Sequence, residues 1–173
     1  MTAVAAPAGA GSATAAPRIL VFSTNNISDP GIDLAGSNHL HYSPGVRVIS
    51  MPCTSGIRPS WILHAIREGF EGVFIASDGD ECAFLPDCAK RASRIVSEAQ
   101  ALLRANGYDA NRLRMAAICS VCAENFAKHM NTFTDALVAL RAKEAAKAAE
   151  AAAAVAAATP ATPVAPTTTE AAK

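Results

Sequence analysis

Four short runs of apolar residues stand out in the central part of the chain. They are Arg18–Ser23, Val46–Met51, Gly72–Ala76 and Leu113–Cys119. None of them alternates regularly between apolar and polar residues. Short continuous apolar runs are typical of parallel strands that are covered on both faces. The pattern therefore predicts a sheet of about four parallel strands.

Apolar residues at helical spacing fill two of the segments between these runs. Helices are predicted over Ser60–Gly69 and Pro86–Asn106. The first contains its own terminating glycine, and Gly107 follows the second, as expected at helix C-termini. Trp61 falls among the apolar positions of the first helix and is expected to lie in the core.

A last helix is predicted to begin near Cys122 and to carry a long apolar stripe. Its members are spaced by 4, 3, 4 and 3 residues: Phe126, Met130, Phe133, Leu137 and Leu140. Beyond this stripe an Ala/Lys/Glu stretch can continue as solvated helix to about Ala158, on helix propensity alone. One more short helix is expected in the first connection, capped by Asp29 with Pro30 at its first position.

The alternation of strands and helices predicts a small doubly wound α/β fold of the flavodoxin or Rossmann type. We expect a three-layer sandwich with about four parallel strands over residues 18–141. Residues 1–17 are expected to be a disordered Ala/Gly/Pro-rich terminus. Residues 142–173 are expected to form an Ala-rich helical extension and a disordered Pro/Thr tail. Folds of this kind bind ligands outside the carboxyl ends of their strands.

Composition and charge exclude some classes of function. The chain has 15 basic and 15 acidic residues, and this balance disfavours binding to nucleic acid through phosphate charge. Much of the 51% apolar content is alanine near the two ends, and no apolar run has the length of a membrane span. No secretory signal pattern is found, so a cytoplasmic protein is expected. Phosphate-cradling glycine motifs and a nucleophile elbow are also missing, which leaves catalysis by this chain alone without support.

The five cysteines are the main candidates for chemistry. All five lie at one edge of the predicted sheet, where the connecting loops converge: Cys119 ends the fourth strand, and Cys53, Cys82, Cys88 and Cys122 follow strands. Grouped cysteines in a reducing compartment favour metal or redox chemistry over a disulfide framework. The last two form a C-x-x-C pair at a helix start, where the helix dipole favours thiolate.

The ordered core resembles the methyl-viologen-reducing hydrogenase delta-subunit family, whose members are small iron–sulfur subunits that also occur fused to heterodisulfide reductase subunits. The matching segments are Asp33–Gly36, Gly45–Ile49, Cys53 with Pro59, Glu68–Val73, Cys82, Leu102–Leu103, Gly107, Asn111–Arg114 and Glu124–Ala127. The resemblance implies a two-iron cluster (2Fe–2S) that passes electrons from a hydrogenase or similar donor subunit to a flavin-containing, heterodisulfide-reductase-like partner.

The chain departs from this family at several cysteine positions. Thr24 and Ile27 stand where the resemblance expects a C-x-x-C pair, and Asp78 stands where it expects another cysteine. Of the family's cysteines, only Cys53 and Cys82 are carried over. The site is therefore expected to be either rebuilt or lost.

A rebuilt site is expected to use four of the five cysteines. Cys53, Cys82, Cys119 and Cys122 are the predicted cluster ligands, with Cys88 as the alternate. A structural zinc site with the same residues is a second hypothesis, since thiolates bind both zinc and iron–sulfur clusters. A cluster-free adaptor protein within a redox complex is the third.

Overall fold

The computed structural model describes residues 15–79, 82 and 84–158. The predicted disorder of the N-terminus and of the Pro/Thr tail falls almost wholly outside these residues. The strands are β1 (Ile19–Thr24), β2 (Val46–Met51), β3 (Gly72–Ser77) and β4 (Leu113–Ala117). The helices are α1 (Ser28–Ser37), α2 (Pro59–Arg67), α3 (Cys88–Ala105) and α4 (Ala123–Ala158), with short 3-10 turns η1 (Thr54–Gly56) and η3 (Ala110–Arg112).

The four strands form one all-parallel sheet in the order β2-β1-β3-β4. The two central strands, β1 and β3, are buried along their whole length. The order changes direction beside β1, because the chain first runs outward to β2 and then crosses back to β3. This topology confirms the predicted doubly wound α/β fold. It also places a switch point at the carboxyl ends of β1 and β3, where such folds bind ligands.

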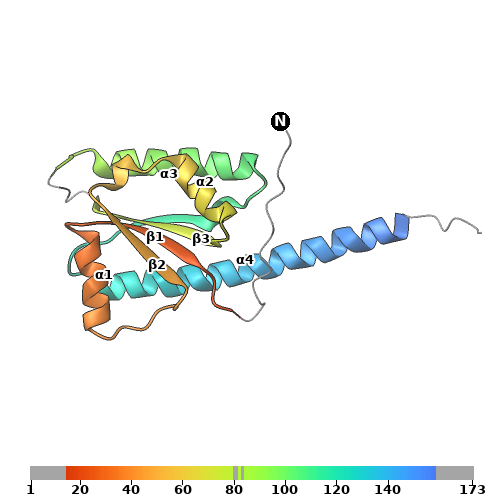
Figure 1. The fold of residues 1–173 in the computed structure, drawn as a ribbon, viewed down its shortest axis with the longest axis horizontal. Coiled ribbons are helices and arrows are strands. Elements are labelled where there is room, and N and C mark those ends of the chain that lie inside the picture. Colours follow the sequence, from red (N-terminus) through yellow and green to blue (C-terminus); the bar gives the residue numbers. More distant parts are fainter. Residues whose placement is uncertain (1–14, 80–81, 83, 159–173) are drawn as a thin grey trace, which may run out of the picture. The chain divides into compact units, whose positions relative to one another are not determined.

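Successive side chains of the central strands point to opposite faces, and two apolar cores result. Ile19 and Val21 pack with α1 and the first part of α4, while Leu20 and Phe22 pack with α2 and α3. In Figure 1, α2 and α3 accordingly lie on one face of the sheet and α1 lies on the other. The two covered faces make the three-layer sandwich that the sequence predicts.

The first part of α4 carries four of the five residues of the predicted apolar stripe, while Leu140, the fifth, is only half-buried. Phe126, Met130, Phe133 and Leu137 are each at most 2% exposed. This part belongs to a compact unit that ends at Val138, and the chain from Ala139 forms a second unit.

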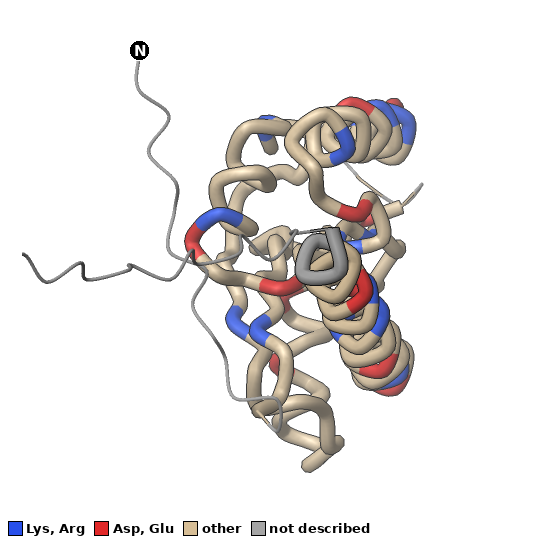
Figure 2. Tube along the Cα trace, turned by 90° about the vertical axis from the view of Figure 1, so that its right-hand side faces the viewer, with Lys and Arg blue, Asp and Glu red and all other residues tan. Residues whose placement is uncertain are grey.

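Figure 2 shows Lys and Arg interspersed with Asp and Glu along the chain, in keeping with its zero net charge. Within the described residues, no helix has both the length and the apolarity that crossing a bilayer requires.

Several local expectations were wrong. β2 is an edge strand with exposed Val48 and Ile49, so it is not covered on both faces. Trp61 is 44% exposed and does not lie in the core, because the buried face of α2 begins at the next residue. Asp29 does not cap α1, because the helix begins at Ser28, two residues before Pro30, and places this carboxylate inside its first turn.

Candidate metal and thiol site

Buried polar side chains collect at the carboxyl ends of the central strands. The buried set there comprises Ser23, Thr24, Ser28, Thr54, Ser77 and Asp78. The hydroxyl of Thr24 donates a hydrogen bond to the carboxylate of Asp78. The hydroxyl of Ser28 accepts from the backbone N–H of Thr24 at 2.7 Å and donates to the carbonyl of Ala76 at 2.9 Å. These bonds join β1, α1 and β3 and offset the cost of burying the polar groups.

Three potential metal ligands meet next to this network. The ligand atoms of Asp78, Cys82 and Cys88 all lie within 4.8 Å of one another, and all three residues are buried. Asp78 directly follows β3, and Cys88 is the first residue of α3. Residues ten positions apart in the chain, one at the end of β3 and one at the start of α3, are thus brought together.

Cys53 lies in the loop after β2, near the group formed by Asp78, Cys82 and Cys88. It precedes η1, and its sulfur lies 2.9 Å from the hydroxyl of Ser55. The next residue, Thr54, places its hydroxyl 4.0 Å from the sulfur of Cys88. The charge of Cys53 contributes to the raised pKa of the Cys88 thiol. Cys53, Cys82 and Cys88 are all free thiols.

The pKa of the Cys88 thiol is raised to about 12. Burial is the largest cause, followed by the charge of Cys53 and by the hydrogen bond and charge of Cys82, while a hydrogen bond with Thr54 acts in the opposite direction. Without a bound cation Cys88 therefore stays protonated at neutral pH. A metal ion would reverse this preference, since its positive charge deprotonates a coordinating thiol.

This raised pKa predicts a loss of stability at alkaline pH in the metal-free protein. The unfolded chain deprotonates Cys88 near its ordinary pKa of 9.0, whereas the folded chain keeps the proton up to about 12. The unfolded state then binds fewer protons, so the free energy of unfolding should fall by about 1.4 kcal/mol per pH unit in this window. Denaturant titrations between pH 9 and 11 should show this slope, and Cys88→Ala should remove it. Equal slopes in the two proteins would contradict the assignment.

The donor set fits a single thiophilic metal ion or one end of an iron–sulfur cluster. Zinc and iron take thiolate sulfur at roughly 2.3 Å with four ligands, so ligand atoms within 4.8 Å of one another can share one ion. Asp78 has a second carboxylate oxygen besides the one that accepts from Thr24. Two positions where the family resemblance expects cysteine, Thr24 and Asp78, are thus hydrogen-bonded to each other.

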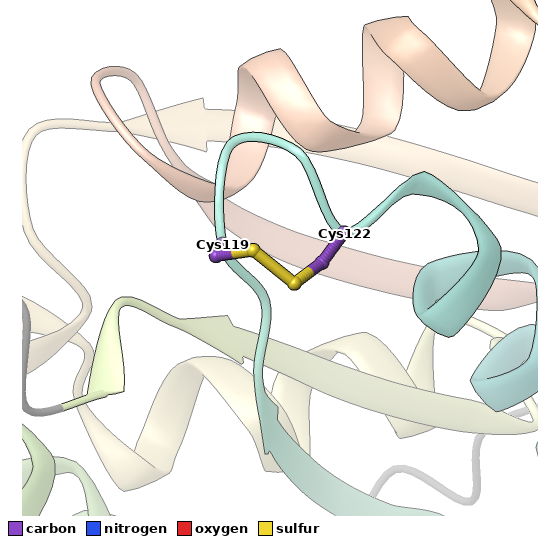
Figure 3. The surroundings of a disulfide bond; sticks show 2 residues. All are labelled: Cys119 and Cys122. Atoms are coloured by element: carbon purple, nitrogen blue, oxygen red, sulfur yellow. A yellow bond between two sulfur atoms is a disulfide. The ribbon is translucent and has the colours of Figure 1, made fainter.

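Cys119 and Cys122 are joined to each other by a disulfide bond (Figure 3). The pair lies in the loop between β4 and α4, which includes the residue where the fourth strand was predicted to end. A bonded pair provides no thiolate, so in this form it offers no ligand. The sequence predicts that the reduced pair joins Cys53 and Cys82 in a metal site, and this remains a prediction.

The structure brings together two residues that the sequence does not favour as ligands. The sequence predicts Cys88 as the alternate ligand, and it has Asp78 where the family resemblance expects a cysteine. The sequence does indicate Asp78 as a possible ligand. A carboxylate can bind a metal ion, and Asp78 stands at a position where the family resemblance expects a cysteine. For Cys88 the missing information was the start of α3 at this residue, not at Pro86.

An open groove of 640 Å³ lies beside the group formed by Asp78, Cys82 and Cys88. Its lining comes from Ser55 and from one face of the start of α3, namely Asp87, Lys90, Arg91, Arg94, Ile95 and Glu98. Ser55 and Asp87 are sequence neighbours of Thr54 and Cys88, whose side chains meet at 4.0 Å. The buried thiols therefore have a charged surface groove close by.

The fold and this edge define a class: a small doubly wound α/β domain with thiols and a carboxylate at its switch point. The family model for the delta subunit of methyl-viologen-reducing hydrogenase matches residues 19–141. The chain belongs to this family, as the resemblance in the sequence indicated.

Curated relatives fall into two groups by size. An iron–sulfur subunit of the F420-non-reducing hydrogenase of Methanococcus maripaludis is 30% identical over 127 residues, which cover 73% of this chain and 94% of that protein. One of the subunits of the ferredoxin:CoB-CoM heterodisulfide reductase of Methanosarcina mazei is 30% identical over 124 residues, 70% of this chain. The matched segment is only 15% of that larger protein.

Proposed function

We propose that this chain is a small iron–sulfur electron-transfer subunit of a multisubunit hydrogenase- or heterodisulfide-reductase-like complex. One observation carries the proposal: in a member of this family, Asp78, Cys82 and Cys88 converge within 4.8 Å at the ligand-binding edge of the sheet. The names of the relatives add support, since several are iron–sulfur subunits of hydrogenases.

We assign Cys53, Cys82, Cys88 and Asp78 as the metal ligands. Cys53 and Cys82 are the two cysteines that the family resemblance carries over, and Cys88 and Asp78 complete a set of four in place of the disulfide-bonded pair. An iron–sulfur cluster, most simply 2Fe–2S, supplies one-electron transfer when bound. The chain's own residues position the thiols, hold Asp78 through Thr24, and cover the site from water.

The partners proposed for this function are an electron-donor protein and a flavin-containing, heterodisulfide-reductase-like protein in the cytoplasm. Electron transfer through a small protein of this kind needs a contact surface near the site. The groove beside the cluster suits this purpose, because its basic and acidic side chains can pair with charges on a partner.

Metal analysis of anaerobically purified full-length protein tests the proposal. We expect bound iron with acid-labile sulfide and visible charge-transfer absorption. The double variant Cys82→Ser/Cys88→Ser should lose both, because serine is a poor ligand for soft metals and two of four ligands are gone. The matched control Cys119→Ser/Cys122→Ser should retain the iron, and circular dichroism should show that both variants are folded.

The other outcomes separate the alternatives. Loss of iron only in Cys119→Ser/Cys122→Ser would contradict our ligand assignment and support the set predicted from the sequence. Bound zinc without sulfide would favour the structural zinc site. Three ligand atoms that lie close to one another also support this alternative. A parent protein without metal after anaerobic reconstitution would overturn the electron-transfer function in favour of the adaptor.

A further inference from the structure

The disulfide between Cys119 and Cys122 lies in an exposed loop held between two buried anchors. Ile118 before the loop is fully buried, and Ala123 after it is 3% exposed. Between them Val121 is 77% exposed, and both cysteines are half-buried. Figure 3 shows the bond bridging the base of this loop, just before α4 begins. The disulfide therefore lies in a partly exposed loop, although the backbone on each side is anchored in the core.

The loop keeps its shape through contacts that do not involve the sulfur atoms. The backbone N–H of Ile118 donates to the carbonyl of Ser77 at 2.9 Å and extends the β3–β4 ladder. The N–H of Cys122 donates to the carbonyl of Cys119 at 3.1 Å, which closes the turn. A Cβ atom on Gly31 would lie only 2.4 Å from that carbonyl oxygen, so α1 packs directly on the loop backbone. Breaking the S–S bond therefore requires no unfolding.

A structural role explains the bond poorly. The two cysteines are only three residues apart, and a disulfide that closes so short a ring removes little entropy from the unfolded chain. The turn is already closed by a backbone hydrogen bond. The bond thus adds little to the stability of a loop that its neighbours hold in place.

Reversible reduction explains the arrangement better. The carbonyl of Cys122 accepts the first hydrogen bond of α4, from Phe126 at 3.0 Å, so this cysteine stands at the positive end of a long helix. The helix dipole stabilises a thiolate leaving group at such a position, and C-x-x-C spacing is typical of thiol–disulfide exchange pairs. Cys122 also packs against the core cluster beneath α4, which leaves Cys119 as the sulfur open to attack.

We infer that Cys119 and Cys122 form a redox-active dithiol–disulfide that exchanges two electrons with a dithiol. A thiolate of the partner attacks the Cys119 sulfur, so the S–S bond breaks, a mixed disulfide forms and Cys122 leaves as a thiolate that takes up a proton. The partner's second thiolate attacks the mixed disulfide and releases Cys119, which is protonated in turn. Two partner thiols become one disulfide, and the chain gains two electrons and two protons.

This activity is independent of the proposed metal site. The exchange uses Cys119 and Cys122, whereas the assigned metal ligands come from the loops after β2 and β3 and from the start of α3. Exposed Val121 between the two cysteines offers an apolar contact for a protein that carries the dithiol. Small dithiols need no such contact, so the two kinds of partner can be told apart by changing this residue.

Reduction of insulin disulfides by dithiothreitol tests the inference with the full-length protein. Catalytic amounts of the chain should accelerate insulin precipitation several-fold over dithiothreitol alone, and Cys119→Ser/Cys122→Ser should lose the acceleration. Ser120→Ala, an exposed position between the two cysteines, is the matched control and should keep it. If the partner is a protein, Val121→Ser should slow the reaction with insulin. Reduction of the Cys119–Cys122 disulfide by dithiothreitol should stay unchanged.

Alkylation and mass spectrometry of the parent protein provide a test that needs no variant. Under dithiothreitol, the folded chain should gain two labels in the peptide that holds Cys119 and Cys122. The variant Cys122→Ser should accumulate a mixed disulfide with glutathione at Cys119, and Cys119→Ser should accumulate less. A bond that survives excess dithiothreitol in the folded protein, or insulin reduction at the rate of dithiothreitol alone, would overturn the inference. Neither result would affect the conclusion drawn from the iron content of the proposed metal site.

Discussion

Replacing Gly31 by alanine should destabilise the protein and disturb the loop that carries Cys119. The added Cβ would lie 2.4 Å from the carbonyl oxygen of Cys119 and 3.4 Å from a methyl carbon of Ile118. The first neighbour is backbone, so the clash cannot be relieved by rotating a side chain, and α1 or the loop has to move. Overpacking of this kind costs about 1–3 kcal/mol, or roughly 2–4 °C in Tm for each kcal/mol.

Gly36→Ala is the matched control in the same helix. A Cβ at this position meets nothing within 4 Å. Alanine there should therefore stabilise α1, by about 0.5–1 kcal/mol, because it reduces the freedom of the unfolded chain. Thermal unfolding of the two variants should move in opposite directions. Equal shifts would mean that α1 does not pack on the disulfide loop as the structure shows.

The sequence predicted the fold because the two central strands dominate the pattern. β1 and β3 are buried on both faces, and continuous apolar runs are what such strands require. The same criterion was misleading for β2, which is apolar but lies at the edge of the sheet with Ile49 48% exposed. Strand order depends on which crossovers the chain makes. A local apolar run carries no information about that.

The candidate site could be predicted only as an edge of the sheet. Parallel strands place all their carboxyl ends together, so five cysteines after strands had to lie on one side of the molecule. Which of them meet depends on the paths of the loops. The loop after β3 brings Cys82 and Cys88 beside Asp78, and the turn after β4 closes Cys119 onto Cys122. The C-x-x-C spacing suits a metal and a disulfide equally well, so the sequence could not choose between them.

Replacing Phe133 by alanine should produce the largest loss of stability among the variants considered. This side chain is fully buried on α4, with its ring 6.2 Å from that of Phe74 on β3. Its ring also covers Gly72, where an added Cβ would lie 2.7 Å from it. Removing the ring leaves a cavity between helix and sheet, at a cost of about 3–5 kcal/mol.

Such a loss is a large share of the roughly 5–15 kcal/mol that holds a domain folded, so Phe133→Ala should unfold at a much lower denaturant concentration. Val138→Ala is the control on the same helix, because Val138 is 47% exposed and should change stability by no more than about 0.5 kcal/mol. A Phe133→Ala protein that loses less than about 1 kcal/mol would mean that α4 contributes little to the fold. The substantial loss expected here would instead show that the apolar stripe of α4 supports the sheet from which both the metal ligands and the disulfide loop emerge.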